Sequence, residues 1–125
     1  MMFDVLTNEL LEDFKDNYEM KQEALAWIER MTRFSVQGGK MNRGLATLAV
    51  FKTLAQARGQ RLSPRELCRA AALGWCVEWL QAFFLVADDL MDGSETRRGQ
   101  PCWYKLPEVR FRRVSSCHGR IIVLL

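Results

Sequence analysis

The 125-residue sequence lacks the features that mark secreted or disulfide-bonded proteins. We expect no secretory leader, because Asp4 and Glu9 stand where such a leader carries basic residues. The four cysteines form no C-x-x-C pair and have no metal-ligand spacing; they are Cys68, Cys76, Cys102 and Cys117. These absences predict reduced thiols in a cytoplasmic protein.

The sequence also lacks a clear membrane-spanning segment. Residues 70–87 are long and apolar enough to suggest one. However, Glu78 and Gln81 interrupt the run, and two aspartates close it. This pattern is typical of a long helix buried inside a protein, so we expect no membrane span.

No strand, repeat or low-complexity tract is indicated, and the sequence predicts an all-α fold. Apolar residues recur at three- and four-residue steps in the first three segments. The fourth begins with a capping box, Ser63-Pro64-Arg65-Glu66, and nothing breaks it before Gly93. The expected helices span about residues 3–18, 25–34, 42–58 and 64–92. Because the fourth is apolar nearly all round, other helices must cover it.

An acidic cluster, D-D-x-x-D, closes this long helix. Asp88 and Asp92 are four residues apart and share one face, and Asp89 flanks them. Anions at a helix C-terminus are unfavourable, which argues against a merely solvated acidic turn. An EF-hand loop is excluded, because Leu90 and Gly99 stand at ligand positions. The cluster predicts Mg²⁺ that bridges to a diphosphate.

Basic residues near the cluster provide candidate diphosphate contacts. Arg97 and Arg98 follow the acidic turn, and GGKMNRG (38–44) places Lys40 and Arg43 at the start of a helix, where backbone N–H groups favour an anion. Either pair is also compatible with solvated surface residues. GGKMNRG is not a Walker loop, because Phe34 stands where the first glycine is required.

Two further side chains on the fourth helix are candidates for the same cavity. Gln81 lies two turns before Asp88 and is a candidate phosphate ligand, or a buried amide bonded to a neighbouring helix. Phe84 lies one turn before Asp88 and is either the floor of an apolar pocket or ordinary core.

Together these segments resemble the farnesyl diphosphate synthase family of short-chain trans-prenyltransferases. The resemblance rests on GGKMNRG and on residues 73–109, in which F-F precedes D-D-x-x-D and T-R-R-G-Q follows it. It covers about residues 3–109 and implies the N-terminal part of the isoprenoid synthase helical bundle, truncated. It also implies a homodimer for the full-length parent and no nucleic-acid partner.

The resemblance implies the reaction and the role of each residue. An allylic diphosphate, dimethylallyl or geranyl, ionises with the help of Mg²⁺, and isopentenyl diphosphate attacks the carbocation to give farnesyl diphosphate. Asp88 and Asp92 would bind Mg²⁺ with Asp89 in support, and Arg97 would bind the allylic diphosphate. Lys40, Arg43, Gln81 and Arg98 would hold isopentenyl diphosphate, and the bulky Phe83 and Phe84 would limit the product to fifteen carbons.

After Val109 the resemblance stops, and the chain continues as RFRRVSSCHGRIIVLL, without an acidic residue. We expect residues 1–109 to be part of a synthase domain and residues 110–125 to be a divergent tail, from a frame change, retained intron or faulty gene model. A genuine basic tail that binds acidic lipid or nucleic acid is the alternative. We expect this chain alone to be inactive. The other hypotheses are a non-catalytic subunit that associates with the full-length synthase, or a relative of the terpene cyclases.

Overall fold

The computed structural model describes residues 1–109, and its architecture is all-α as predicted. The elements are α1 (Met2–Tyr18), α2 (Gln22–Val36), α3 (Asn42–Ala57), α4 (Pro64–Asp92), β1 (Thr96–Arg97), β2 (Gln100–Pro101) and the 3-10 helix η1 (Trp103–Lys105). All four expected helices are confirmed, with bounds that differ by at most a few residues. The expected tail, with Cys117, lies outside the described residues.

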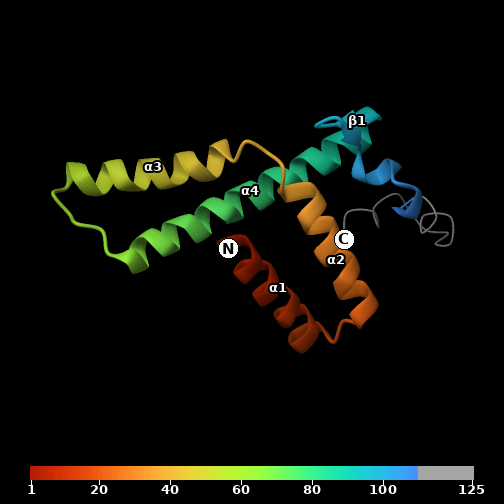
Figure 1. Cartoon of the computed structure of the whole chain (residues 1–125), viewed down its shortest axis with the longest axis horizontal. Helices are drawn as coiled ribbons and strands as arrows, with labels where there is room; N and C mark the ends of the chain where they lie inside the picture. The colour runs from red at the N-terminus through yellow and green to blue at the C-terminus, as the bar shows by residue number, and fades with distance from the viewer. Residues whose placement is uncertain (110–125) are drawn as a thin grey trace.

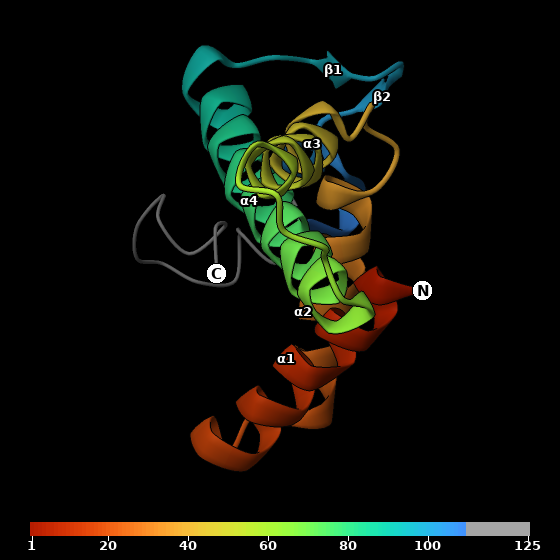
Figure 2. The same ribbon diagram turned by 90° about the vertical axis from the view of Figure 1, so that its left-hand side faces the viewer.

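The helices form two antiparallel hairpins, α1–α2 and α3–α4. Helices α3 and α4 run side by side in opposite directions, and this is the most extensive contact between elements (Figure 1). Helices α1 and α2 form the second hairpin and pack against one side of α4 (Figure 2). The segment that follows α4 returns to contact the end of α2 through η1.

Helix α4 begins and ends where local chemistry dictates. The backbone N–H of Ser63 donates to Glu66 Oε2 at 2.8 Å, and the Ser63 side chain accepts from the Glu66 N–H, so the predicted capping box is present. Pro64 is the first helical residue, and Gly93 ends the helix with a left-handed φ of 68°. These signals define the 29-residue helix that carries the acidic cluster.

Two glycines allow α3 and α4 to approach closely. A Cβ added to Gly74 would lie 2.9 Å from the carbonyl oxygen of Gly44, and a Cβ on Gly44 would lie 3.1 Å from the carbonyl oxygen of Gly74. At the same crossing the N–H of Gly44 donates to Glu78 Oε1 at 2.8 Å. Glu78 therefore interrupts the apolar surface of α4 because it caps the first turn of α3.

A small aromatic core lies where α1 and α2 meet α4. Phe3 and Val36 are buried against Ala82, and the Phe3 ring lies 5.0 Å from the Trp75 ring, centroid to centroid. Arg33 of α2 donates to Asp4 of α1 at 2.8 Å. This core packs the C-terminal end of α2 and the start of α1 against α4.

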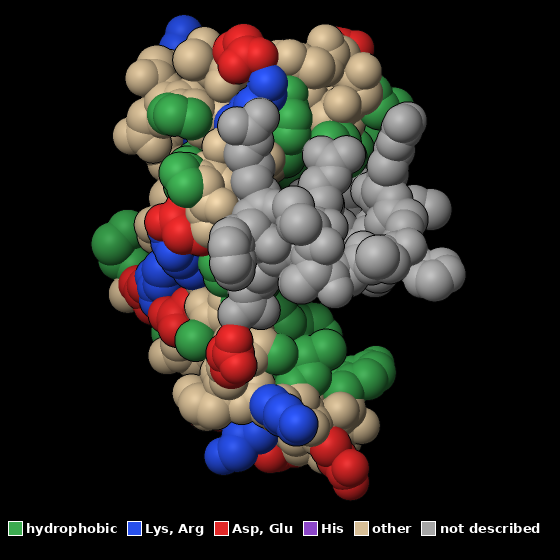
Figure 3. All heavy atoms as spheres, turned by 90° about the vertical axis from the view of Figure 1, so that its right-hand side faces the viewer, with side chains coloured by type: hydrophobic (Ala, Val, Ile, Leu, Met, Phe, Trp, Pro, Cys, Tyr) green, Lys and Arg blue, Asp and Glu red, His purple; other side chains and the backbone are tan. Residues whose placement is uncertain are grey.

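The far side of α4 is uncovered within residues 1–109. Leu80 and Phe84 on this side are each more than half exposed. Only 17% of the most apolar stretch of α4 is buried, and its length and composition alone would allow it to cross a membrane. The expectation that other helices cover α4 all round is thus met only in part, by α3 and by the α1–α2 hairpin. Hydrophobic side chains are also open to solvent, between charged ones, in Figure 3.

Candidate functional site

A two-stranded hairpin follows the acidic cluster. Strands β1 and β2 are antiparallel, with Thr96 opposite Pro101 and Arg97 opposite Gln100. The two turn residues, Arg98 and Gly99, have φ values of 54° and 76°, which is the left-handed pair that a tight two-residue hairpin requires. The sequence predicted no strand, so this short hairpin is a difference from the expected all-helical chain. Because of this turn, the side chains of Arg97 and Arg98 contact different partners.

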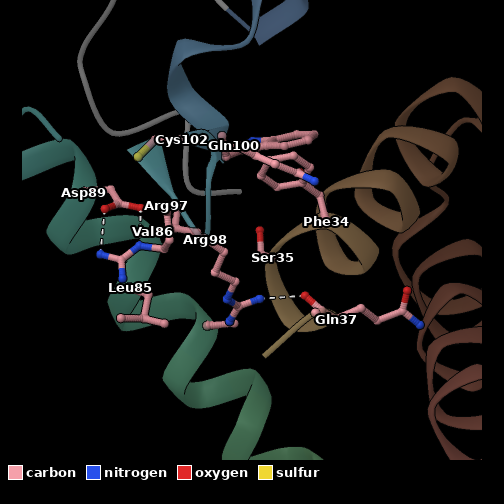
Figure 4. Close-up of a pocket in the computed structure, with 13 residues that line it drawn as sticks. Phe34, Ser35, Gln37, Leu85, Val86, Asp89, Arg97, Arg98, Gln100 and Cys102 are labelled. Atoms are coloured by element: carbon pink, nitrogen blue, oxygen red, sulfur yellow. Dashed lines mark hydrogen bonds and ion pairs between the residues drawn. The ribbon is translucent and has the colours of Figure 1, made fainter. Parts of the chain in front are cut away.

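Arg97 forms a two-pronged ion pair with Asp89. Its Nε donates to Asp89 Oδ2 and its Nη2 to Asp89 Oδ1, each at 2.7 Å (Figure 4). Asp89 is only 4% exposed. The hydrogen bonds from Arg97 hold the pKa of the Asp89 carboxyl below its usual value, and the pKa of Arg97 is raised in turn. Both are therefore charged at neutral pH.

Asp88 and Asp92 lie in a different environment from Asp89. Both are exposed, and neither accepts a hydrogen bond or forms an ion pair within the described part of the chain. A step of about 100° per residue turns Asp88 away from Asp89, whereas Asp92 returns to the side of Asp88. The three carboxylates therefore do not converge.

The two exposed carboxylates fit Mg²⁺ as partial ligands. No group of three or more acidic, histidine or cysteine side chains is arranged around a metal position among residues 1–109. Mg²⁺ nevertheless often binds through one or two carboxylates and completes its octahedron with water and substrate phosphate. The donor set of Asp88 and Asp92 satisfies that requirement, with Asp89 outside it.

Arg98 joins the hairpin to the glycine-rich segment after α2. Its Nη1 donates to the carbonyl oxygen of Gln37 at 2.6 Å (Figure 4). A Cβ on Gly39 would lie 3.0 Å from Arg98 Nη2, and Gly38 has a left-handed φ of 82°. The glycines of GGKMNRG thus make room for an arginine from the hairpin, and the two predicted basic segments lie side by side.

Lys40 and Arg43 are exposed on either side of the start of α3. Lys40 precedes Met41, whose left-handed φ of 53° turns the chain into the helix. Arg43 lines an apolar groove between α3 and α4 of about 780 Å³, together with Val50 and Leu73. Of the backbone N–H groups at the start of α3, that of Gly44 already donates to the Glu78 carboxylate, so it is not available to an external anion.

The remaining predicted residues lie along α4. Gln81 forms no hydrogen bond within residues 1–109, so the bonded-amide alternative is not observed there. It lies seven residues before Asp88 and thus on the same side of the helix. Phe83 and Phe84 contact each other, with ring centroids 5.6 Å apart, and both are more than half exposed. Phe83 lines a cavity of about 220 Å³ between α4 and the α1–α2 hairpin, together with Leu10 and Val36.

A cavity of about 160 Å³ lies under the hairpin, between α2 and α4. Asp89, Arg97, Arg98 and the end of α2 line it (Figure 4). Its volume exceeds that of a few waters, and its polar wall combines the Asp89–Arg97 ion pair and Arg98 with the uncharged side chains of Ser35, Gln37 and Gln100. Anions of phosphate chemistry match this wall better than cations do.

Sequence reasoning missed the residues that anchor this hairpin. Trp103 is buried, and its ring lies 5.2 Å from the rings of both Trp27 and Phe34 on α2, centroid to centroid. Cys102 is 1% exposed, and burial raises the pKa of its thiol. The adjacent Cys102-Trp103 pair after the arginines was the available signal, since both residue types favour buried positions.

Comparison with known proteins places these features in one family. Residues 25–113 match the family model described as polyprenyl synthetase. The chain is 52% identical over 108 residues to farnesyl pyrophosphate synthase 1 of Cannabis sativa, covering 86% of this chain and 30% of that protein. It is 54% identical over 104 residues to farnesyl diphosphate synthase of Dictyostelium discoideum, covering 83% of this chain and 26% of that protein.

A solved structure gives the same result. The structure of T. brucei farnesyl diphosphate synthase complexed with bisphosphonate superposes with a TM-score of 0.79 at 36% identity, covering 90% of this chain and 32% of that one. The fold is therefore the helical fold of that enzyme, over its corresponding part. The chain spans about a third or less of the length of the relatives that it matches.

Proposed function

The chain belongs to the polyprenyl synthetase family, and we propose that it forms the magnesium- and diphosphate-binding N-terminal part of a prenyltransferase that makes farnesyl diphosphate. One observation carries this proposal. Asp88 and Asp92 are exposed, unpaired and one turn apart on α4, at a helix end where two anions only lower stability unless a cation joins them.

The proposed reaction joins two diphosphates. The C–O bond of an allylic diphosphate breaks, the double bond of isopentenyl diphosphate attacks the allylic cation, and a proton is lost. Mg²⁺, held by Asp88 and Asp92, would neutralise charge on the leaving diphosphate when bound. Arg97 would contact the same group through Nη1, since its other two nitrogens are bonded to Asp89.

Isopentenyl diphosphate has a separate set of proposed ligands. Lys40 and Arg98 flank Gly38-Gly39, and Gln81 lies on the Asp88 side of α4. Arg43 completes the set from the first turn of α3. These cations are exposed, so they are accessible to a second diphosphate. A terpene cyclase would not need this second set of diphosphate ligands. The presence of the set therefore favours a condensing enzyme.

Product length is proposed to depend on two rings. Phe84 lies one turn from Asp88, so a prenyl chain that extends from the metal site along α4 would meet it first. Phe83 lies about 100° further round the helix and supports it, ring against ring. Two bulky side chains at this depth favour a fifteen-carbon product.

These 125 residues are proposed to be inactive alone. Within residues 1–109 the metal position has one acidic wall, and the resemblance implies a second aspartate-rich motif in the part of the relatives that this chain does not span. Without a second wall, water would reach the allylic cation. Detection of farnesyl diphosphate from purified chain, both substrates and Mg²⁺ would contradict this point alone.

A non-catalytic subunit is the second candidate function. The observation that favours it is the exposed apolar side of α4, which includes Leu80 and Phe84. A full-length synthase would bring helices able to cover that side, in a homodimer-like pairing. Co-purification of the tagged chain with a full-length synthase, without gain in turnover, would support it.

Cellular location and chain boundaries belong to the same proposal. A cytoplasmic location is proposed, although one relative with 49% identity is named farnesyl pyrophosphate synthase 1, mitochondrial. Residues 1–109 are proposed as the synthase part and residues 110–125 as a divergent tail. Cell fractionation and the transcript sequence beyond the Val109 codon test these two points.

Metal-dependent anion binding tests the central proposal. Isothermal titration of the chain with inorganic pyrophosphate should show binding in Mg²⁺ and at least about tenfold weaker binding in EDTA. Asp88→Asn with Asp92→Asn should remove the Mg²⁺ dependence. Lys40→Ala should weaken isopentenyl diphosphate more than pyrophosphate. Unchanged Mg²⁺ dependence in the double variant would contradict the assignment of the acidic cluster.

A further inference from the structure

The α3–α4 hairpin is strongly basic at the turn that joins its two helices. Residues 41–77 contain six Lys or Arg and a single acidic residue, Glu66. Residues 1–36, which form the α1–α2 hairpin, instead contain four Lys or Arg and eight Asp or Glu. The basic turn lies at one end of the molecule, and the acidic cluster lies at the other end of α4 (Figure 1). The two hairpins therefore differ in charge, and the basic turn lies outside the site described above.

Four arginines of this turn are available to an external anion. Each is exposed, and none of their guanidinium groups forms an ion pair or a hydrogen bond within residues 1–109. The four are Arg58, Arg61, Arg65 and Arg69. The carboxylate of Glu66 is held in the capping box, where it accepts from the Ser63 N–H at 2.8 Å and from the Ser63 hydroxyl at 2.7 Å. The turn therefore keeps an excess of positive charge.

An apolar groove runs beside these arginines. It has a volume of about 780 Å³ and is lined by residues of α3 and α4 alone. Arg69 lines it, and Arg65 lies one turn before Arg69 on the same side of α4. Arg58 follows Leu54 by one turn at the end of α3. Three aliphatic side chains that line the groove are more than half exposed, namely Val50, Leu54 and Leu73. Guanidinium groups and exposed aliphatic side chains therefore share one face of the hairpin.

This combination of side chains fits the surface of an anionic membrane. Aliphatic side chains enter the boundary between headgroups and acyl chains, whereas the long stems of Arg and Lys let their charged ends stay at the level of the lipid phosphates. An anionic leaflet attracts basic residues that lie within a Debye length of it, which is about 8 Å at physiological salt. A nucleic acid would use the arginines but would leave the aliphatic groove unused, because its contacts are mainly polar.

We propose that the α3–α4 hairpin binds the surface of anionic membranes through the four arginines of its turn and the exposed aliphatic side chains of its groove. The contact is peripheral, with the hairpin lying on the headgroups. This inference is independent of the proposed function, because the acidic cluster lies at the far end of the 29-residue α4, about 43 Å from its first residue.

Co-sedimentation of the 125-residue chain with lipid vesicles tests the choice of partner. Vesicles that contain phosphatidylserine in phosphatidylcholine should bind the chain at least about tenfold more tightly than vesicles of phosphatidylcholine alone. This binding should be lost at about 1 M salt, where the Debye length is only about 3 Å. Equal binding to the two kinds of vesicle would overturn the proposal. Tighter binding to double-stranded DNA than to phosphatidylserine vesicles would assign the arginines to a nucleic acid and would also overturn it.

Two variants with the same net charge identify the surface that binds. The triple variant Arg58→Gln, Arg65→Gln and Arg69→Gln should weaken binding to phosphatidylserine vesicles about tenfold or more. The matched control replaces three exposed lysines elsewhere by glutamine, namely Lys15, Lys21 and Lys52, and should weaken binding about threefold or less. Residues 110–125 are the same in both variants, so their basic side chains contribute equally. Equal losses would show that net charge alone acts, and the hairpin would not be the binding surface.

The apolar part of the surface has its own matched pair on α3. Leu54→Ser should weaken vesicle binding about fivefold. Leu45 is similarly exposed but lies nine residues away, on the opposite side of α3, so Leu45→Ser should change binding by less than about twofold. Equal effects would exclude the groove from the contact. Circular dichroism checks that each variant is folded. If the arginine triple variant does not fold, Arg61→Gln with Arg65→Gln replaces it, with Lys15→Gln and Lys52→Gln as its control, and the same comparison decides.

Discussion

The two sides of the C-terminal half of α4 differ in the burial and in the bonding partners of their side chains. On the side that faces α2, Ala82 is buried in the aromatic core and Asp89 is paired with Arg97 at 2.7 Å. On the opposite side, Phe84 and Asp88 are exposed, and Asp88 has no hydrogen bond within residues 1–109. One helix therefore places a structural carboxylate and an available carboxylate on adjacent residues. The first side provides stability, and the second is free for ligands.

Removal of Arg97 should have the largest effect on the paired side. Arg97→Ala leaves the Asp89 charge buried without a partner, and we expect a loss of about 3 kcal/mol in the free energy of unfolding. Urea denaturation followed by circular dichroism measures it. Arg98→Ala is the matched control, because the exposed Arg98 bonds only a carbonyl oxygen, and it should cost about 1 kcal/mol or less. Equal losses in both variants would remove the distinction.

A fall in pH should gradually remove the stability that the Asp89–Arg97 ion pair contributes. The hydrogen bonds from Arg97 lower the folded-state pKa of Asp89, so its stabilising contribution is complete above the unfolded value of about 3.9 and is lost as the pH falls through the folded value. Unfolding free energies of the wild type and Asp89→Asn should therefore converge below about pH 4. A constant difference from pH 6 to pH 2 would show that the charge of Asp89 contributes nothing.

The helix boundaries could be predicted because they depend on nearest neighbours. The capping box at Ser63 and Glu66 and the stop at Gly93 are local signals, and both are confirmed. The division of labour among the aspartates could not be predicted in this way. It depends on a left-handed turn at Arg98 and on packing of Trp103 against α2, which join residues far apart in the sequence.

The role of Glu78 could not be predicted from the sequence either. In the sequence it is an unexplained charge in an apolar run, whereas in the structure it caps α3 at Gly44. Only the close crossing of Gly44 with Gly74 brings that carboxylate within 2.8 Å of its donor. Helical periodicity predicts which face a residue occupies, but not which backbone group it meets.

The glycine crossing provides a smaller and different perturbation. Gly74→Ala should gain about 1 kcal/mol from helix propensity, yet its Cβ would lie 2.9 Å from the Gly44 carbonyl oxygen. Because backbone atoms on both helices must separate, we expect a net loss of about 1–2 kcal/mol in urea denaturation. Gly44→Ala, where a Cβ would meet a backbone oxygen at 3.1 Å, should cost less. A net gain for Gly74→Ala would mean that the helices separate without cost.

Neutralisation of the two exposed aspartates, Asp88 and Asp92, should change the free energy of unfolding least. The sign of the change should depend on whether Mg²⁺ is present. Without Mg²⁺, the double variant Asp88→Asn with Asp92→Asn removes two like charges from a helix C-terminus and should gain a few tenths of a kcal/mol. With saturating Mg²⁺ and pyrophosphate, only the wild type gains binding free energy, so the order of the two melting temperatures should reverse. Both temperatures are measured by circular dichroism.

Asp16 provides the matched control for this reversal. It is an exposed aspartate in the last turn of α1, so Asp16→Asn should give a similar small gain without Mg²⁺. The gain should persist in Mg²⁺ and pyrophosphate, because no arginine pair closely follows Asp16 in the chain, although Glu12 lies one turn before it. If the order at Asp88 and Asp92 did not reverse, the exposed carboxylates would be an ordinary solvated helix end, and the two sides of α4 would differ in burial alone.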